Sequence, residues 1–386
     1  MGNYIYSLAY LPLFLVLIFL SIPVLPNGRI PVYTCFRTGF TIFALILFIA
    51  FRAYVYADWV FYESFYEKVP SLLIGLKEIG SYLNRGIEPG FVLYVSFCKI
   101  FSSEYLVFQA MSSLVDIVVL YYFFKQYIPD NIIMGFAAFY VWGLYMEMDL
   151  LRNVKAIMLF LISIKYLRPK KIIPYMLLNL AGILFHISSL FYIPFYFISN
   201  LKYRRVFIFL VWLTGNIIFL CRIKWMAGIL SFMDTVLPIQ RMSFLIQRYR
   251  VREIYSSFYG MSLGYIERQL TFLMIFLLQD KLIMSNKNNH VFINLAYIYL
   301  FIYLYFSEMF ILAARIPQLF LCSYWILYPG IYRILKKENK YLFLCLFLAY
   351  GIIRIAYNNA MPERRYENFL FPHDSPAQRM DILLHD

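Results

Sequence analysis

The chain has 386 residues, of which 62% are hydrophobic, 21% aromatic and only 15% charged. A soluble domain of this length carries far more charge, so the composition excludes a soluble enzyme and predicts an all-α polytopic membrane protein. The net charge of +14 comes from 35 basic and 21 acidic residues. The basic residues lie in short clusters between apolar segments, a pattern typical of cytoplasmic loops. We therefore expect a lipid bilayer and no nucleic acid among its partners.

The N-terminus and the cysteines exclude two further features. The first apolar segment, MGNYIYSLAYLPLFLVLIFLSIPVL, has no basic start and no small-residue cleavage site. It is therefore predicted to be a first membrane helix and not a cleaved signal peptide. The five cysteines are scattered and odd in number, so we expect neither a disulfide framework nor a cysteine metal site. No metal and no cofactor are predicted.

Apolar stretches long enough to cross a bilayer, which takes about 20 residues, recur along the chain. The candidates are residues 4–25, 39–57, 104–124, 131–147, 151–167, 206–222, 265–283, 291–307, 309–331 and 341–357. The stretch FVLYVSFCKIF, which follows Pro89 and Gly90, covers about half a span. Together these segments predict one integral membrane domain over 1–360 with about 10 to 13 transmembrane or half-membrane helices. A polar tail at 361–386, expected to be only partly ordered, completes the chain.

The segment 172–200 is too long for one span and is flanked by two basic loops, RPKK at 168–171 and KYRR at 202–205. Short basic loops stay in the cytoplasm, so this segment is predicted to enter the membrane and return. Two half-helices would meet near residues 185–189. The same reasoning, with the KKENK run at 336–340 also inside, puts the connections 58–103 and 223–264 on the non-cytoplasmic side.

Two ionisable residues are predicted to approach that non-cytoplasmic side, Arg152 and His186. Such a group at membrane depth costs roughly 2.5 to 3.5 kcal/mol and persists mainly where it faces protein, water or a ligand. Arg152 suits bidentate phosphate recognition, and Lys155 lies one helical turn beyond it. The alternative is an interfacial arginine that snorkels to the membrane surface or pairs with Asp149. His186 could act as a base or a hydrogen-bond donor, or it could be a hydrogen-bonded core residue.

Further candidates lie in the predicted outer connections. Asp58 and Arg85 precede Glu88, which Pro89 constrains to an extended conformation at the mouth of the bundle. The alternative for Glu88 is a helix start that favours an acidic residue. 

Two arginines complete the candidates. Arg315 lies inside an apolar stretch. It could bind a ligand, or it could pair with Glu308, two turns earlier. Arg248 belongs to the run QRMSFLIQRYRVREIYSS, an amphipathic stripe that could gather anionic lipid-linked substrates or merely anchor its loop.

Several common catalytic patterns are missing from the sequence. It contains no P-loop, GxSxG, HExxH or Rossmann glycine motif. Nucleotide hydrolysis, serine hydrolysis and zincin chemistry are therefore disfavoured.

Four stretches of the chain are similar to a known family. They are Asp58, the segment NRGIEPGFVL, the helix LLRNVKAIMLFLISIKYL and the segment LAGILFHISSLFYIPFYF. With them, most of residues 50–330 resembles the EpsG family of bacterial polysaccharide polymerases, related in role to Wzy-type O-antigen polymerases. The chain departs from the family pattern at Asn153, where glutamine is common, and at Lys155, which replaces an apolar residue.

The resemblance implies a membrane core like that of C-type glycosyltransferases in the bacterial inner membrane. The expected reaction joins polyprenyl-diphosphate-linked oligosaccharides into capsular, exopolysaccharide or O-antigen chains at the outer face, without ATP. A flippase and a chain-length regulator are possible partners. His186, Arg152 and Glu88 are the expected catalytic residues. The expected substrate-binding residues are Arg315, Asp58, Arg85, Lys155 and Arg248.

Two other functions fit parts of the sequence. A transporter or flippase of lipid-linked sugars would also have a broken helix and intramembrane arginines, but it is favoured by inverted repeats, which we do not detect. A membrane acyltransferase would place its histidine in a polar cluster, unlike LFHISS.

Overall fold

The computed structural model of the chain describes residues 3–22, 31–83, 86–226, 228–229 and 258–385. Every regular element in these ranges is a helix, and their only strand-like feature is an isolated antiparallel bridge between Arg52 and Asn368. The predicted all-α fold is confirmed. Helices suit an apolar chain of this kind because each helix satisfies its own backbone hydrogen bonds.

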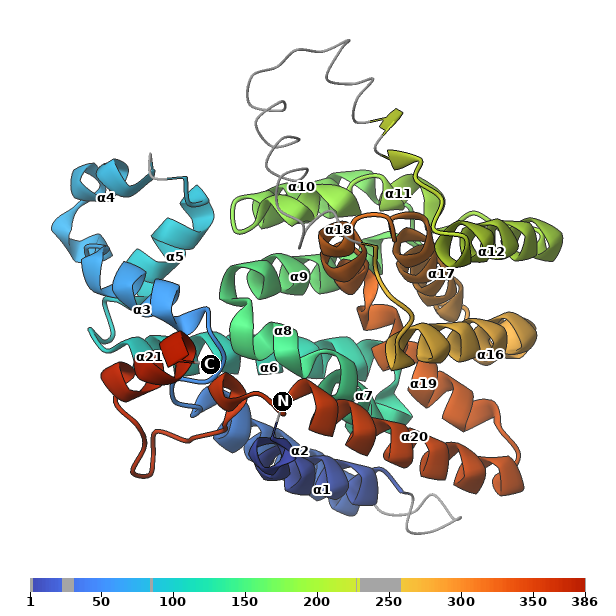
Figure 1. Cartoon of the computed structure of the whole chain (residues 1–386), viewed down its shortest axis with the longest axis horizontal. Coiled ribbons are helices and arrows are strands. Elements are labelled where there is room, and N and C mark those ends of the chain that lie inside the picture. Colours follow the sequence, from blue (N-terminus) through green and yellow to red (C-terminus); the bar gives the residue numbers. More distant parts are fainter. Residues whose placement is uncertain (1–2, 23–30, 84–85, 227, 230–257, 386) are drawn as a thin grey trace. The chain divides into compact units, whose positions relative to one another are not determined.

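The chain divides into two compact units, Met1–Tyr196 with Tyr328–Asp386, and Phe197–Leu327. The first unit contains the helices η1 (Tyr4–Tyr10), α1 (Leu11–Ser21), α2 (Pro31–Leu45), η2 (Ile46–Ala50), α3 (Trp59–Lys68), η3 (Leu72–Ile74), α4 (Leu76–Leu83), α5 (Pro89–Cys98), α6 (Tyr105–Tyr127), η4 (Pro129–Asn131), α7 (Ile132–Trp142), α8 (Leu144–Asp149), α9 (Leu151–Ser163), η5 (Ile164–Tyr166), α10 (Ile172–Ile183), η6 (Ile187–Tyr192), α20 (Lys337–Asn358), η8 (Pro362–Arg364) and α21 (Pro376–His385). The second contains α12 (Arg205–Leu220), α16 (Leu263–Ser285), α17 (Asn289–Tyr305), α18 (Phe310–Arg315) and η7 (Pro317–Phe320), while α11 (Phe195–Ile198) and α19 (Cys322–Ile334) run across the boundaries (Figure 1).

Three helices within the described ranges are long and apolar enough to cross a membrane, namely Tyr4–Ser21, Tyr105–Tyr127 and Lys337–Asn358. The bent pair Phe310–Phe320 and Cys322–Ile334 would add a fourth if it forms one span. The other apolar helices are shorter, with 10–17 residues. These helices indicate a membrane protein. The count of 10 to 13 membrane segments and the single domain over 1–360 stay predictions.

The predicted break in the segment 172–200 is confirmed at residues 184–186, between α10 and η6. The two halves run antiparallel, because the hydroxyl of Tyr175 donates to the carbonyl of Tyr192 at 2.6 Å and that of Ser189 donates to the carbonyl of Asn179 at 3.0 Å. Figure 1 shows α10 beside α9, against which it packs. The hairpin therefore brings its tip to the start of α9.

The connection 58–103 is helical and has its own apolar core. We call this core the loop cluster; it comprises Tyr54, Trp59, Tyr62, Phe65, Tyr66, Val69, Ile79, Phe91, Val92, Val95, Cys98, Tyr105, Phe108 and Leu151. Its members come from α3, α4, α5, the first turn of α6 and the start of α9, with Tyr54 before α3 and Val69 directly after it. Burial of so many aromatic rings, each worth roughly 1.5 to 3 kcal/mol, fixes these helices against the start of α9.

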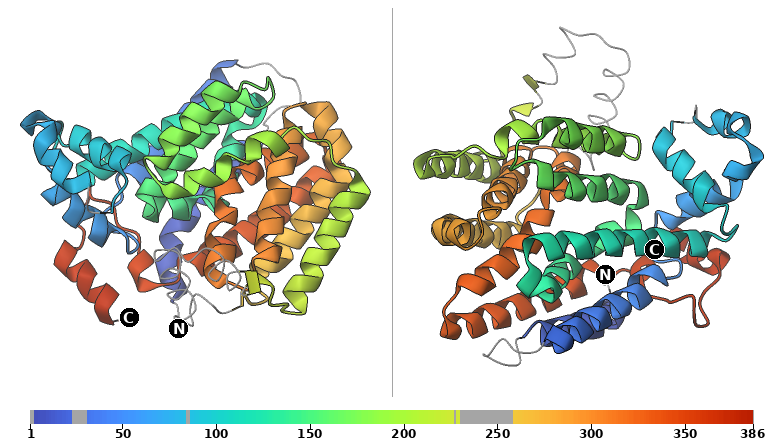
Figure 2. Two further views of the ribbon diagram at one scale, coloured as in Figure 1. Left: turned by 90° about the horizontal axis from the view of Figure 1, so that it is seen from above. Right: turned by 180° about the vertical axis from the view of Figure 1, so that it is seen from behind.

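The N- and C-terminal helices of the first unit pack together. Helix α20 lies alongside α1, as Figure 2 shows from two further directions. The rings of Phe14 and Phe347 meet edge to face with centroids 6.1 Å apart. Gly351 faces the ring of Phe14 so closely that a side chain there would displace it.

The second unit is held by aromatic and amide contacts among α12, α16 and α17. The ring of Trp212 stacks on Phe272 with centroids 5.2 Å apart, and its indole N–H donates to Gln269 at 2.7 Å. The hydroxyl of Tyr265 donates to Asn216 at 2.7 Å. These two hydrogen bonds join α12 to α16.

Candidate functional site

Three chain segments of the first unit meet at the tip of the hairpin: the start of α5, the start of α9 and residues 184–188. Pro89 occupies the first turn of α5, where its missing N–H costs no hydrogen bond. The main-chain N–H groups of Gly90 and Phe91 donate to the carbonyl of Leu184 at 2.8 and 3.2 Å. The end of α10 is therefore capped by the start of α5, which places Glu88 beside the break.

Arg152 and Glu88 form an ion pair at this junction. Nη1 of Arg152 donates to Oε2 of Glu88 at 2.8 Å, and the two side chains keep 26% and 19% of their surface exposed. The guanidinium lies 5.3 Å from the ring centroid of Phe61, and the hydroxyl of Tyr62 lies 3.5 Å from the main-chain nitrogen of Arg152. The pair is held on one side by α3 and is open to solvent on another.

His186 is linked to the same helix start through Ser188 and Asn153. Its Nδ1 accepts the main-chain N–H of Ser188 at 3.2 Å and lies 2.7 Å from the Ser188 hydroxyl. That hydroxyl donates to Oδ1 of Asn153 at 2.9 Å. In the tautomer that accepts this main-chain N–H, Nδ1 carries no proton and the ring proton lies on Nε2. His186 therefore caps η6. Asn153 orients it through the hydroxyl of Ser188.

Gly90 allows the close contact between α5 and α10. A Cβ atom at this position would lie 2.8 Å from both the Cβ and the carbonyl oxygen of Leu184. We expect Gly90→Ala to push the two segments apart, to lower the free energy of unfolding by about 1 to 3 kcal/mol and to reduce activity by moving Glu88. Thermal unfolding in detergent and activity in membranes check this. Gly80→Ala, where nothing lies within 4 Å, is the matched control. It should leave activity unchanged and, because alanine favours the helix, should raise the free energy of unfolding by up to about 1 kcal/mol. Equal losses from both variants would contradict the packing argument.

Asp58 stands at the start of α3, next to the carboxylate of Asp149. Oδ1 of Asp149 accepts the main-chain N–H groups of Asp58 at 3.0 Å and Ala57 at 3.3 Å. An acidic side chain at a helix N-terminus is favourable because it pairs with unsatisfied N–H groups. Asp149 therefore anchors α3, and the alternative in which it pairs with Arg152 is not the arrangement in this structure, where Arg152 pairs with Glu88.

Lys155 points away from the Arg152–Glu88 pair into the interior. It is buried, its ammonium pairs with Asp116 of α6, and it donates to the carbonyl of Ser112 at 2.9 Å. The ring of Tyr94 lies 5.7 Å away. This surrounding favours a structural role, and substrate binding by Lys155 stays a prediction.

A second buried charge, Arg52, escaped the sequence analysis. It is fully buried and donates to the carbonyls of Ile49 (2.7 Å) and Glu147 (3.0 Å) and to the hydroxyl of Ser113 (2.9 Å). Asp116, which is also buried, pairs with Lys155, whereas Arg52 is hydrogen-bonded to neutral carbonyl and hydroxyl groups. The available signal was Asp116, an acidic residue in the middle of the apolar helix α6.

Three candidate arginines remain. Arg315 belongs to the second unit, where it is exposed and makes no ion pair with any residue the structure describes. Its expected partner Glu308 accepts the main-chain N–H of Met226 at 2.7 Å. Arg85 and Arg248 lie outside the described residues. Roles for these three arginines stay predictions.

No group of three or more histidine, cysteine or acidic side chains in the described part of the chain could hold a metal ion. The groups that do gather are a guanidinium, a carboxylate and an imidazole. Such a set can bind an anion, accept a proton and donate a hydrogen bond.

Comparison with known proteins gives one match. The model of the EpsG family matches residues 36–375. The match includes α3, α5, α9 and the hairpin, and ends before α21. No curated protein and no solved structure matches the chain.

Proposed function

This chain belongs to the EpsG family of Wzy-like polysaccharide polymerases, and on that basis we propose that it polymerises polyprenyl-diphosphate-linked oligosaccharides at the outer face of the bacterial inner membrane. A polymerase of this family acts on lipid-linked oligosaccharide in a membrane. The product would be a capsular, exopolysaccharide or O-antigen chain. The observation that supports this proposal most is the meeting of Glu88, Arg152 and His186 at the hairpin tip.

The proposed reaction transfers the growing chain from its diphosphate carrier to a hydroxyl of the next lipid-linked unit. The bond between the anomeric carbon and the diphosphate oxygen breaks, and a glycosidic bond to the acceptor oxygen forms. The acceptor loses a proton, and the carrier leaves as a polyprenyl diphosphate. The carrier bond supplies the driving force, so no nucleotide is required.

Arg152 is proposed to bind the leaving diphosphate. A guanidinium has five N–H donors in a planar fork and binds phosphate oxygens in pairs. Because one hydrogen bond joins it to Glu88, an arriving diphosphate can compete for its other donors. Preorganised positive charge then stabilises the negative charge that develops as the carrier leaves.

Glu88 is proposed to accept the proton of the acceptor hydroxyl. An anion bound to Arg152 competes with Glu88 for the guanidinium, which leaves the carboxylate oxygens available to the acceptor hydroxyl. In the tautomer with its proton on Nε2, His186 is better suited to donate a hydrogen bond from that nitrogen than to act as the base. This division of roles follows from the bond between Nδ1 and the Ser188 N–H.

A deletion strain tests the proposed function. Without the gene, single lipid-linked repeat units should accumulate and long polymer should disappear; the wild-type gene should restore the polymer. A flippase, the alternative function, would instead trap the units at the cytoplasmic face, where glycosidases added to spheroplasts cannot reach them. Protected units would contradict the polymerase, and accessible units without polymer would support it.

A further inference from the structure

The C-terminal segment 361–385 is bound along the chain that leads into α3. Three main-chain hydrogen bonds join the two, from Ala53 N–H to Glu367 (2.9 Å), from Phe369 N–H to Phe51 (2.9 Å) and from Tyr56 N–H to Glu363 (2.8 Å). The side chains of Tyr366 and Asn368 donate to the carbonyls of Phe48 (2.8 Å) and Leu47 (2.7 Å). The tail that was expected to be partly ordered is thus paired with residues 47–56.

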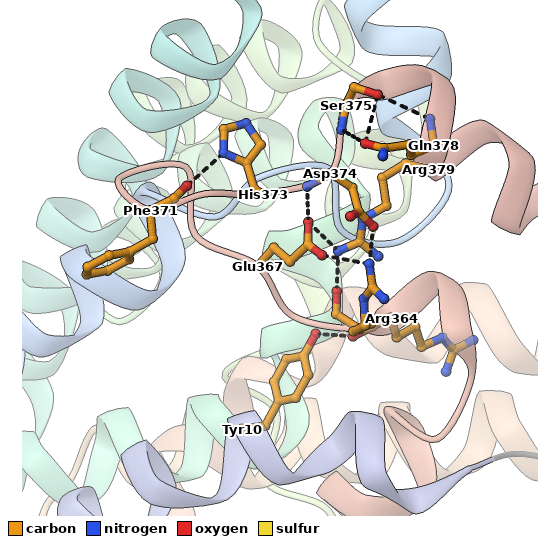
Figure 3. A network of polar contacts seen from close by, with 10 residues as sticks. Tyr10, Arg364, Glu367, Phe371, His373, Asp374, Ser375, Gln378 and Arg379 are labelled. Atoms are coloured by element: carbon orange, nitrogen blue, oxygen red, sulfur yellow. Dashed lines mark hydrogen bonds and ion pairs between the residues drawn. The ribbon is translucent and has the colours of Figure 1, made fainter.

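A four-residue ion network closes this segment on itself (Figure 3). Arg379 of α21 is only 2% exposed; it pairs with Glu367 at 3.1 Å and donates to the carbonyl of Arg365 at 2.7 Å. Arg365 in turn pairs with Glu367 at 2.7 Å and with Asp374. Burial alone would raise the pKa of Glu367, but the main-chain N–H of Asp374 and the two arginines outweigh it and lower that pKa. Breaking the network would leave a buried charge without a partner.

The segment also contacts the helices that surround the candidate site. Leu383 of α21 packs against the loop cluster, and the ring of His373 lies 6.3 Å from that of Tyr54, a member of the cluster. Figure 1 shows α21 beside α3. Helix α3 carries Phe61 and Tyr62, the two aromatic residues that contact Arg152.

We propose that residues 361–385 form a clamp that holds α3 and the loop cluster against the start of α9, with Arg379 as a positioning residue for the Arg152–Glu88 pair. The importance of that pair for polymerisation rests on the proposed function. The existence of the clamp does not rest on the proposed function, because it follows from contacts among residues 47–62 and 361–385. Helix α21 lies beyond the residues matched by the family model.

The buried thiol of Cys98 reports on the loop cluster independently of activity. Cys98 is 2% exposed. In a chain whose other four cysteines are replaced by serine or alanine, we expect Arg379→Ala to raise the rate of maleimide labelling of Cys98 at least about tenfold, because local opening exposes it. Polymer synthesis by the same membranes should fall. Arg379→Lys, which keeps the charge, should retain more of both properties.

Two controls separate the clamp from a general loss of folding. Ala377→Ser changes an exposed neighbour of Arg379 on the same helix and should alter neither readout. A disulfide between Phe51→Cys and Phe369→Cys, at positions joined by a main-chain hydrogen bond of 2.9 Å, should restore slow labelling and polymer synthesis to Arg379→Ala.

The outcomes are distinguishable. Unchanged Cys98 labelling in Arg379→Ala would overturn the clamp. Faster labelling with unchanged polymer synthesis would overturn the positioning role. Failure of the cross-link to restore synthesis while it restores slow labelling would also overturn that role. If even the wild type made no polymer, the proposed function would fall, and Cys98 labelling would still decide whether the clamp exists.

Discussion

Arg152→Ala should lower the rate of polymerisation by roughly 10²- to 10³-fold, the usual effect of removing one preorganised donor from a developing anion. The rate of Arg152→Lys should lie between those of Arg152→Ala and the wild type, because an ammonium keeps the charge but lacks the planar fork that binds two phosphate oxygens. The measurement is the rate of chain elongation from lipid-linked repeat units in membranes that contain equal amounts of each variant. A rate for Arg152→Ala within a factor of two or three of wild type would remove Arg152 from the site.

Arg333→Ala is the matched control for this experiment. Arg333 also pairs with an acid, Asp130, at 3.2 Å, but both side chains are at least half exposed. Exposed pairs contribute about 0 to 1 kcal/mol, so this variant should elongate chains at the wild-type rate. The role of Glu88 is tested by adding Glu88→Gln to Arg152→Ala. If Glu88 only holds Arg152, this double variant should be no slower than Arg152→Ala alone. A further drop of roughly 10²- to 10⁴-fold would indicate that Glu88 also takes the proton.

Charge counting in the sequence located the hairpin, because that argument depends only on which short loops are basic. The RPKK and KYRR loops required the segment 172–200 to turn back, and the helix does break at 184–186. For Glu88 and Arg152, the sequence predicted only that both lie at the same face of the membrane. Which side chains pair depends on the bond between Gly90 and Leu184, a contact between segments about ninety residues apart that no local pattern encodes.

Tertiary packing also explains why the expectations for Lys155 and for residues 361–386 differ from the structure. Lys155 lies one turn from Arg152 on α9, and this spacing suggested a joint role in substrate binding. Helix α9 turns it toward Asp116 on α6 instead. Residues 361–386 were predicted to be a polar tail because charged residues at a chain end are usually solvated. In the structure, Arg379 and Glu367 of this segment are instead paired and largely buried.

The Lys155–Asp116 pair is the second place where a large effect is expected. Asp116→Ala would leave the ammonium of Lys155 buried without its carboxylate, and we expect the free energy of unfolding to fall by about 3 to 5 kcal/mol. Thermal or denaturant unfolding of the purified protein in detergent measures this. Asp280→Ala breaks the exposed pair with Arg205 and should cost less than about 1 kcal/mol. Equal losses from the two variants would mean that burial does not govern the strength of these pairs.

The double variant Asp116→Leu/Lys155→Met separates structure from substrate binding at Lys155. Replacing a buried ion pair by apolar side chains of similar volume is often neutral or stabilising, so this variant should unfold close to the wild type. If Lys155 only supports α9, polymerisation should return with stability. If the double variant is stable but makes no polymer, the charge of Lys155 is needed in the reaction. Its place one turn below Arg152 would then extend the diphosphate site into the interior of the first unit.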